Sequence, residues 1–309
     1  MRYVILAKGQ HKGFNIPRQL SVINSERLLD RTIRLLRENG VKDIIVTGSY
    51  TDIDAKVIDP KGNTYDYNND SKGYWLDAFD GLLEEPTTFL MGDVYFSEVA
   101  IKTIVNTDKE MFFCSDKNTS KDYIKEWDEP FGYKVINTDR FKEAIKKAKD
   151  LYDNGKTKRN PIIWEVYRLL NGININKHKL TYNYIAINDI TCDIDKPEDV
   201  AKINFKLGVG KMIRVKAKIN FSYSKFSEVK ELVRANAEGN QEGTIQPGDM
   251  FIVSNEQAEY LTEKADWCKA NGPLVDIIEV IPEEKKETKE EKKEVKKATK
   301  KATKKTTKK

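Results

Sequence analysis

The chain has 309 residues, of which 39% are hydrophobic and 33% are charged, and its formal net charge is +5. Residues 283–309 contain 13 Lys and 6 Glu, a local charge of +7, so residues 1–282 carry −2. Any argument from basic charge for nucleic-acid binding therefore applies at most to this tail. No segment approaches 18 apolar residues, which excludes a membrane-spanning helix.

Cysteine and histidine usage excludes two further classes. Cys114, Cys192 and Cys268 are odd in number and far apart, so the sequence contains no disulfide framework and no zinc motif. This usage predicts a reducing, cytoplasmic environment. His11 and His178 have no ligand partners at metal spacing, and the apolar run at the N-terminus is too short for a signal peptide.

Apolar runs and helical spacing predict an alternation of strands and helices through residues 1–208. Ser25 is positioned to cap the first helix and Ser97 the second. The predicted strands are Tyr3–Ala7, Asp43–Thr47, Thr87–Met91, Glu110–Cys114 and Tyr182–Asn188. The predicted helices are Leu28–Asn39, Glu98–Val105, Arg140–Tyr152, Pro161–Leu170 and Pro197–Leu207. This alternation predicts an α/β fold with a Rossmann-like, mostly parallel sheet covered on both faces.

A second, strand-rich pattern follows the linker-like segment Gly208–Gly210. Ile213–Ile219 alternates apolar and basic residues as a half-buried strand does, and Pro247–Asp249 is a turn before the strand Met250–Val253. Three parts are therefore expected: an α/β domain over residues 1–208, a small β-rich α+β module over 212–282, and a disordered Lys-rich tail over 283–309.

The loop after the first strand has the composition of a phosphate site. Ligands of open α/β sheets bind beyond the carboxyl ends of the strands, which singles out the loops after Ala7 and Met91. The first of these loops contains glycines, which let the backbone approach a phosphate closely. Lys8, Lys12 and Arg18 can neutralise a triphosphate. An ordinary solvated surface loop is the alternative interpretation.

Aspartates follow strands at two places. Asp93 follows the predicted strand Thr87–Met91 after Gly92, and Asp193 and Asp195 precede the last helix of the α/β domain. Mg²⁺ takes one or two protein carboxylates together with substrate phosphates, so these aspartates are candidate ligands. Two structural roles are the alternatives: Asp93 begins a turn, and Asp195 with Glu198 three residues later forms a capping box.

These segments resemble the GT-A-like nucleotidyltransferase family, which includes the MobA-like NTP transferases. That family has L-A-A-G-x-G-x-R, then P-K-x-L, a Gly-Asp at a strand end, and a late I-D-T-x-E-D-L. The matching positions here are Leu6, Ala7, Gly9, Pro17, Leu20, Gly92 and Asp93, with Asp195 at the aspartate of the late motif. The departures are Lys8 for Ala, His11 for Gly, Gly13 for Arg and Arg18 for Lys.

The resemblance implies a Mg²⁺-dependent enzyme that transfers a nucleotidyl group from an NTP to a small acceptor, for example a phosphorylated one, and releases pyrophosphate. It implies catalytic roles for Asp93, Arg18 and Lys8, and metal binding by Asp93, Asp195 and Asp193. The implied nucleotide-binding residues are Leu6, Ala7, Lys8, Gly9 and Arg18, with Ser71 and Gly73 in the base-reading loop.

Two other functions are consistent with the sequence. A GT-A glycosyltransferase would use a nucleotide-sugar and the same metal carboxylate, although Arg18 in its P-x-x-L element favours nucleotidyl transfer. A non-catalytic phage-associated protein is the other, because Met212–Lys216 and Gly248–Leu261 resemble small β modules of phage structural and assembly proteins. Such a phage or prophage product would act in the host cytoplasm. The tail is expected either to bind polyanions weakly and non-specifically or only to solubilise the chain.

Overall fold

The computed structural model describes residues 1–8, 13–59, 73–116, 128–209, 212–222, 229–235 and 244–281. The chain divides into two compact units, one of Met1–Leu207 with Ile277–Glu279 and one of Gly208–Asp276 with Val280–Lys309. The predicted disordered tail, residues 283–309, lies outside the described residues. Among the described residues, no helix has the length and apolarity needed to cross a membrane.

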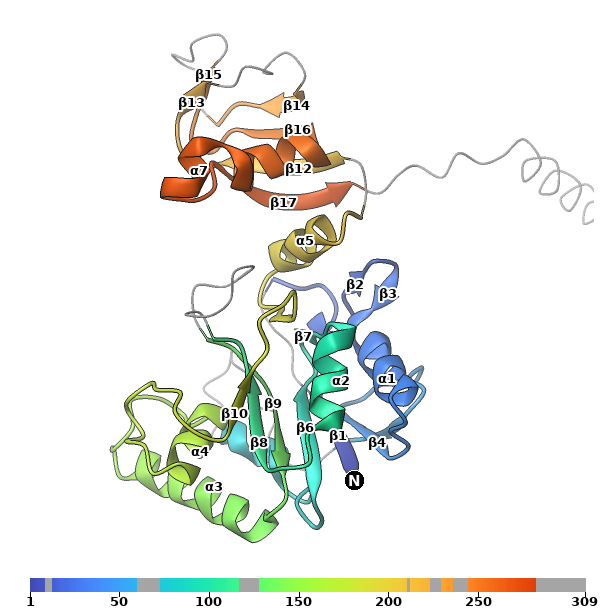
Figure 1. The fold of residues 1–309 in the computed structure, drawn as a ribbon, viewed down its shortest axis with the longest axis vertical. Helices are drawn as coiled ribbons and strands as arrows, with labels where there is room; N and C mark the ends of the chain where they lie inside the picture. Colours follow the sequence, from blue (N-terminus) through green and yellow to red (C-terminus); the bar gives the residue numbers. More distant parts are fainter. Residues whose placement is uncertain are drawn as a thin grey trace, which may run out of the picture. The chain divides into compact units, whose positions relative to one another are not determined.

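A seven-stranded sheet forms the centre of the first unit (Figure 1). Its strands, in spatial order, are β10 (Tyr184–Ala186), β8 (Met111–Cys114), β9 (Pro130–Val135), β6 (Thr87–Met91), β1 (Arg2–Leu6), β4 (Ile44–Thr47) and β5 (Lys56–Ile58). All neighbours are parallel except that β9 is antiparallel to both β6 and β8. The predicted α/β class with a Rossmann-like, mostly parallel sheet is therefore confirmed, and the predicted strands lie on β1, β4, β6, β8 and β10.

Two pairs of helices flank this sheet. The paired helices are α1 (Leu28–Glu38), α2 (Glu98–Asn106), α3 (Thr138–Asp153) and α4 (Ile163–Leu170), and a fifth helix, α5 (Pro197–Lys206), follows later in the chain. Helix α1 packs with α2 and α3 packs with α4, and Figure 1 shows the two pairs on opposite sides of the strands. Phe112 of β8 meets Trp164 and Tyr167 at ring-centroid distances of 4.9 and 4.8 Å, so these two aromatic residues fix α4 on the sheet.

The start of α1 differs from the prediction. Asn24 and Ser25 have φ values of +49° and +66° and form the turn between β2 (Val22–Ile23) and β3 (Glu26–Arg27), so Ser25 does not cap the helix. Helix α1 follows Arg27 without a side-chain cap. At α2 the prediction is confirmed, because Ser97 Oγ accepts the backbone N–H of Ala100 at 2.9 Å.

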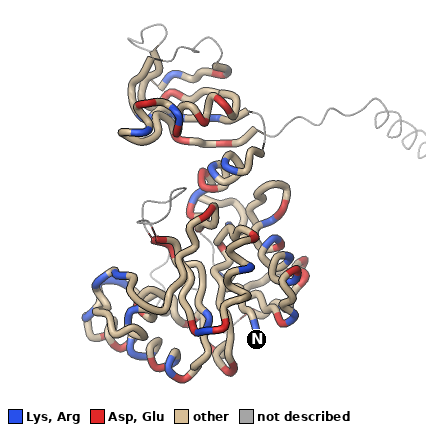
Figure 2. The backbone as a smooth tube through the Cα atoms, in the orientation of Figure 1, with Lys and Arg blue, Asp and Glu red and all other residues tan. Residues whose placement is uncertain are grey.

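The arginines of α1 are paired with acids and leave no broad cationic face there. Arg34 contacts Glu26 at 2.7 Å and Glu38 at 2.9 Å, and Arg27, which directly precedes the helix, contacts Asp30 at 2.5 Å. Figure 2 shows basic and acidic residues interspersed along this helix. These side chains are partly exposed to solvent, which screens such pairs to about 1 kcal/mol or less each, so they solubilise the helix more than they stabilise it.

A four-stranded sheet, in which β16 is antiparallel to both of its neighbours, organises the C-terminal residues. Its strands, in spatial order, are β14 (Lys230–Val233), β16 (Met250–Ser254), β12 (Met212–Ala217) and β17 (Val275–Ile281), and it is joined by the short helices α6 (Asn255–Glu259) and α7 (Asp266–Asn271). The predicted turn before β16 is present. There Asp249, which is fully buried, accepts hydrogen bonds from the backbone N–H groups of Ala235 at 2.9 Å and Gln246 at 3.0 Å and from Arg234 at 2.7 Å.

Candidate nucleotide and metal site

The carboxyl ends of β1 and β6 are in direct contact. The backbone N–H of Gly92 donates to the carbonyl of Leu6 at 2.9 Å, and a Cβ at Gly92 would lie 2.8 Å from the Cα of Ala7. Only glycine permits this approach. It places Asp93, the next residue, beside the start of the loop that the sequence marks as a phosphate site.

We expect Gly92→Ala to destabilise the protein by about 1–3 kcal/mol, because the added methyl meets backbone that cannot move aside. The same displacement should shift Asp93 and lower turnover. Thermal unfolding measures the first effect. Gly81→Ala is a reference substitution, because its site has no atom within 4 Å and a φ of +73°, so it reports backbone strain without a clash. Equal loss of stability in both variants would contradict the close-contact explanation.

Arg18 lies between two of the predicted metal ligands. It belongs to the 3₁₀ turn Arg18–Leu20, and its guanidinium forms ion pairs with Asp93 and, at 3.1 Å, with Asp195. It also donates to the carbonyl of Ile194 at 3.2 Å. Burial acts to lower the pKa of Arg18, but the surrounding aspartates outweigh burial and raise it. The guanidinium is a permanent positive charge at this edge of the sheet.

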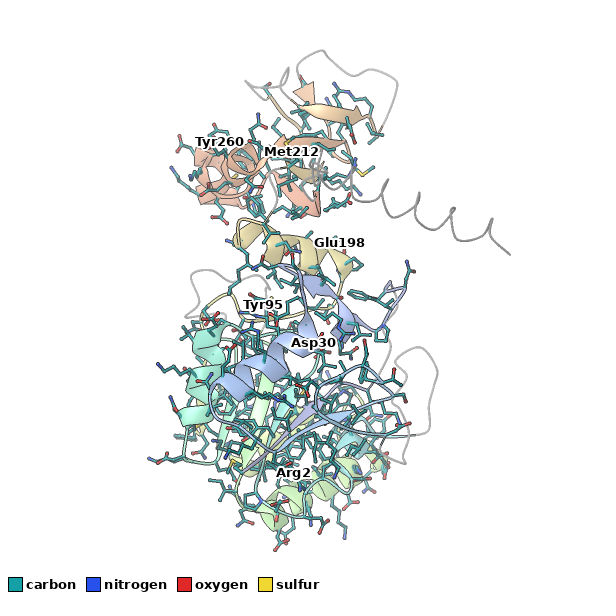
Figure 3. All side chains as sticks on the ribbon, turned by 90° about the vertical axis from the view of Figure 1, so that its right-hand side faces the viewer. Arg2, Asp30, Tyr95, Glu198, Met212 and Tyr260 are labelled. Carbon is teal, nitrogen blue, oxygen red and sulfur yellow. The ribbon has the colours of Figure 1, made fainter. Side chains whose placement is uncertain are left out.

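A two-stranded ribbon brings the late aspartates to the same place. β11 (Cys192–Asp193) pairs antiparallel with β7 (Val94–Tyr95), and the backbone N–H of Ile194 donates to the carbonyl of Asp93 at 2.9 Å. Tyr95 and Ile194 are buried in one apolar cluster that includes Ile203 of α5. Figure 3 shows Tyr95 beneath α5, with Glu198 on that helix. Packing of α5 on the ribbon therefore fixes Asp193 and Asp195 relative to Asp93.

Glu129, the residue before β9, joins these aspartates, and no feature of the sequence predicted it. One carboxylate oxygen from each of Glu129, Asp193 and Asp195 lies within 4.8 Å of the others. Burial, followed by the charges of Asp93 and Asp195, raises the pKa of Asp193 well above its usual value. No motif marks Glu129, because its position depends on the pairing of β9 with β6 and β8.

The cap of α5 also differs from the expected capping box. The carboxylate of Asp199 accepts the backbone N–H groups of both Asp195 and Lys196 at 3.0 Å, so Asp199 satisfies the helix start. The side chain of Asp195 points to Arg18 instead. The Asp195–Glu198 capping interpretation is therefore wrong, because the helix begins one residue later than that pairing requires.

Asp199→Ala should cost about 0.5–2 kcal/mol of stability through the lost cap and leave metal binding largely intact. Asp195→Ala should show the reverse pattern, with little loss from capping and a sharply raised Mg²⁺ requirement. Thermal unfolding and a Mg²⁺ titration of activity separate the two. A stability loss in Asp195→Ala with an unchanged Mg²⁺ requirement would make Asp195 structural and leave Asp193 as the candidate ligand.

The structure describes the contacts of four other predicted site residues. Lys8 forms an ion pair with Asp59 at 2.6 Å, and both backbone polar groups of Ala7 are engaged, the N–H with Thr47 and the carbonyl with Tyr50. Leu6 accepts the bond from Gly92, and Gly73 is buried and held by Asn160. Gly9 and Ser71 lie outside the described residues.

The cluster of Glu129, Asp193 and Asp195 is suited to a hard divalent cation. Its donors are all oxygens, which Mg²⁺ and Mn²⁺ prefer, and no cysteine or histidine belongs to it. Asp193 Oδ1 is buried and has no hydrogen-bond partner among the described residues, so it is available as a ligand. The residues present are therefore suited to Mg²⁺, although the same set would also take Mn²⁺.

No family model matches the sequence, and no curated protein matches it. Solved structures resemble the chain at low identity. The CTP:phosphocholine cytidylyltransferase of Streptococcus pneumoniae is 15% identical, with 67% of this chain and 98% of that chain covered and a TM-score of 0.43. A putative glucose-1-phosphate thymidylyltransferase of Bacillus anthracis is 11% identical, with 66% and 93% covered and a TM-score of 0.41. HddC of Yersinia pseudotuberculosis is 16% identical, with 67% and 99% covered and a TM-score of 0.38.

Proposed function

We propose that this chain is a Mg²⁺-dependent nucleotidyltransferase, which transfers a nucleotidyl group from an NTP to a small acceptor, for example a phosphorylated molecule, and releases pyrophosphate. The observation that carries the proposal is the meeting of Arg18 with Asp93 and Asp195 at the carboxyl edge of the sheet. A phosphate-binding cation and metal-binding carboxylates then lie together beside the loop that begins at Lys8. Nucleotidyl transfer needs these parts, because it depends on positioning and charge stabilisation.

The proposed roles divide between carboxylates and cations. Asp93, Asp195 and Asp193 would hold Mg²⁺, which when bound supplies charge stabilisation at the α-phosphate and the departing pyrophosphate. Arg18 binds and orients the phosphates through its planar fork, for which its present carboxylate partners must give way. Lys8 adds a second cation, which Asp59 holds at the start of the loop.

The backbone completes the proposed nucleotide site. Leu6 and Ala7 anchor the start of the phosphate loop through their bonds to the neighbouring strands. The N–H of Gly9 would bind a phosphate oxygen, as in other glycine-containing anion sites. Ser71 and Gly73 would contact the base.

The decisive assay incubates the full-length chain with each NTP, Mg²⁺ and a metabolite extract and follows pyrophosphate release. We expect release with one NTP that requires both the extract and the metal. Consumption of a nucleotide-sugar with release of a nucleoside diphosphate, and no pyrophosphate, would instead indicate a GT-A glycosyltransferase. Absence of both reactions with every donor would favour the non-catalytic, phage-associated alternative.

We expect removal of residues 283–309 to leave NTP turnover unchanged, because this Lys-rich segment has too few apolar residues to join a core. The same truncation, after Pro282, should abolish retention on DNA at low salt if the tail binds polyanions through counterion release. Unchanged retention would eliminate the polyanion role. A collapse in turnover would show that the tail folds onto the enzyme, contrary to the expected disorder.

A further inference from the structure

Asp195 adjoins two possible cation positions. The first lies between Asp195 and Asp93 and holds the guanidinium of Arg18, whose Nη1 is 3.1 Å from Asp195 Oδ1. The second lies among Asp195, Asp193 and Glu129, whose carboxylate oxygens are within 4.8 Å of one another. Asp93 does not belong to this second group. The two positions therefore share Asp195 and differ in their remaining carboxylates.

The second position is built into the fold. Glu129 is only 6% exposed, and its backbone is fixed by two hydrogen bonds with Ser115, at 2.7 Å to the hydroxyl and 2.9 Å from the N–H. The preceding Asp128 contacts His178 Nε2 at 2.6 Å, which holds the segment from its other side. Asp193 Oδ1 is buried and has no hydrogen-bond partner among the described residues.

Charge balance shows why a cation belongs there. Like charges at this separation repel strongly where water is excluded, and a buried charge is stable only when it is paired. Arg18 brings a single positive charge, which its ion pairs with Asp93 and Asp195 already engage. A divalent cation with oxygen ligands would offset the mutual repulsion of Glu129, Asp193 and Asp195, whose carboxylate oxygens lie within 4.8 Å of one another.

We propose that Glu129, Asp193 and Asp195 form a divalent-cation site that fills before the nucleotide arrives, while Arg18 keeps Asp93 paired. The inference rests on the proposed nucleotidyl transfer and deepens it, because it adds Glu129 to the ligands and orders the binding steps. When a triphosphate arrives, Arg18 transfers to its phosphates and Asp93 becomes available as a ligand. Metal binding therefore depends on Asp93 only when the nucleotide is bound.

The test measures Mn²⁺ binding to the full-length chain without nucleotide, by the electron paramagnetic resonance signal of free Mn²⁺. Glu129→Gln and Asp193→Asn should each weaken binding by at least about 10-fold, because each removes a charged ligand from a small set. Asp93→Asn should weaken it by less than about 3-fold under these conditions. Glu198→Gln, a matched substitution in the first turn of α5, should leave it unchanged.

Wild-type affinity in Glu129→Gln, or no Mn²⁺ binding by the native chain, would overturn the inference. So would a loss in Asp93→Asn equal to that in Glu129→Gln, which would place the metal between Asp93 and Asp195. Asp193→Asn gives an independent result if Glu129→Gln does not fold, which its thermal unfolding reveals. Pyrophosphate release separates the two proposals: Mn²⁺ binding with no transfer overturns only the enzyme activity, and transfer with Glu129-independent binding overturns only the metal site.

Discussion

Asp93→Asn is expected to lower NTP turnover by at least about 10²-fold while the fold stays intact, since metal charge stabilisation contributes several kcal/mol to such reactions. Asp93 stands at the carboxyl end of β6, is 18% exposed, and pairs with Arg18. The substitution keeps the shape of the side chain but removes the charge that attracts Mg²⁺. Pyrophosphate release under saturating NTP and Mg²⁺ measures the effect, and thermal unfolding verifies the fold.

The matched control is Asp43→Asn. Asp43 also pairs with an arginine, Arg2 at 3.1 Å. It precedes β4, however, so it lies at the amino-terminal end of the strands, opposite to Asp93, and it is half exposed. Its loss should leave turnover unchanged. Near-normal pyrophosphate release by Asp93→Asn, or an equal loss in both variants, would rule out a metal-binding role for Asp93.

Arg168→Met should destabilise the protein by about 3 kcal/mol or more. Arg168 and Glu165 form an ion pair at 3.0 Å on α4, with side chains only 7% and 4% exposed. Arg168 also donates to the carbonyl of Ile175 at 2.7 Å. Methionine retains much of the packing but leaves Glu165 and this carbonyl buried without their main partner, and breaking a buried pair costs about 3–5 kcal/mol.

Arg159→Met is the control for this prediction, because Arg159 contacts the same carboxylate oxygen of Glu165 at 3.2 Å. Its side chain is 56% exposed, so the solvent-screened pair should contribute less than about 1 kcal/mol. Urea or thermal unfolding compares the two variants. Similar losses in both would show that burial does not govern the strength of these contacts.

Local sequence determined the elements of the α/β fold. The continuous apolar run Thr87–Met91 has the same bounds as β6, because a strand covered on both faces needs apolar residues throughout. Ser97 caps α2 because a hydroxyl before a helix can satisfy its first N–H groups without help from distant residues. Because ligands of such sheets bind at the carboxyl ends of the strands, the sequence also predicts Asp93 and the loop after Ala7 as candidate ligand contacts.

Strand β9 is an element that the local sequence pattern does not predict. Pro130 and Gly132 weaken its strand pattern, yet the strand forms because it lies between β6 and β8. Gly132 is required there by a distant residue, since a Cβ would lie 2.4 Å from the carbonyl oxygen of Phe89. The missed strand also concealed Glu129, which immediately precedes it.

The sequence by itself determined which segments form strands and helices and which residue types could serve phosphate and metal. Only the tertiary structure decided which side chains meet: Arg18 with Asp195 across 177 positions, and Glu129 with Asp193. It also decided that Asp199, and not Asp195, satisfies the start of α5. The physical reason is that periodicity and capping act over a few residues. The pairing of charges depends instead on strand order and packing, which bring distant residues into one buried, low-dielectric place.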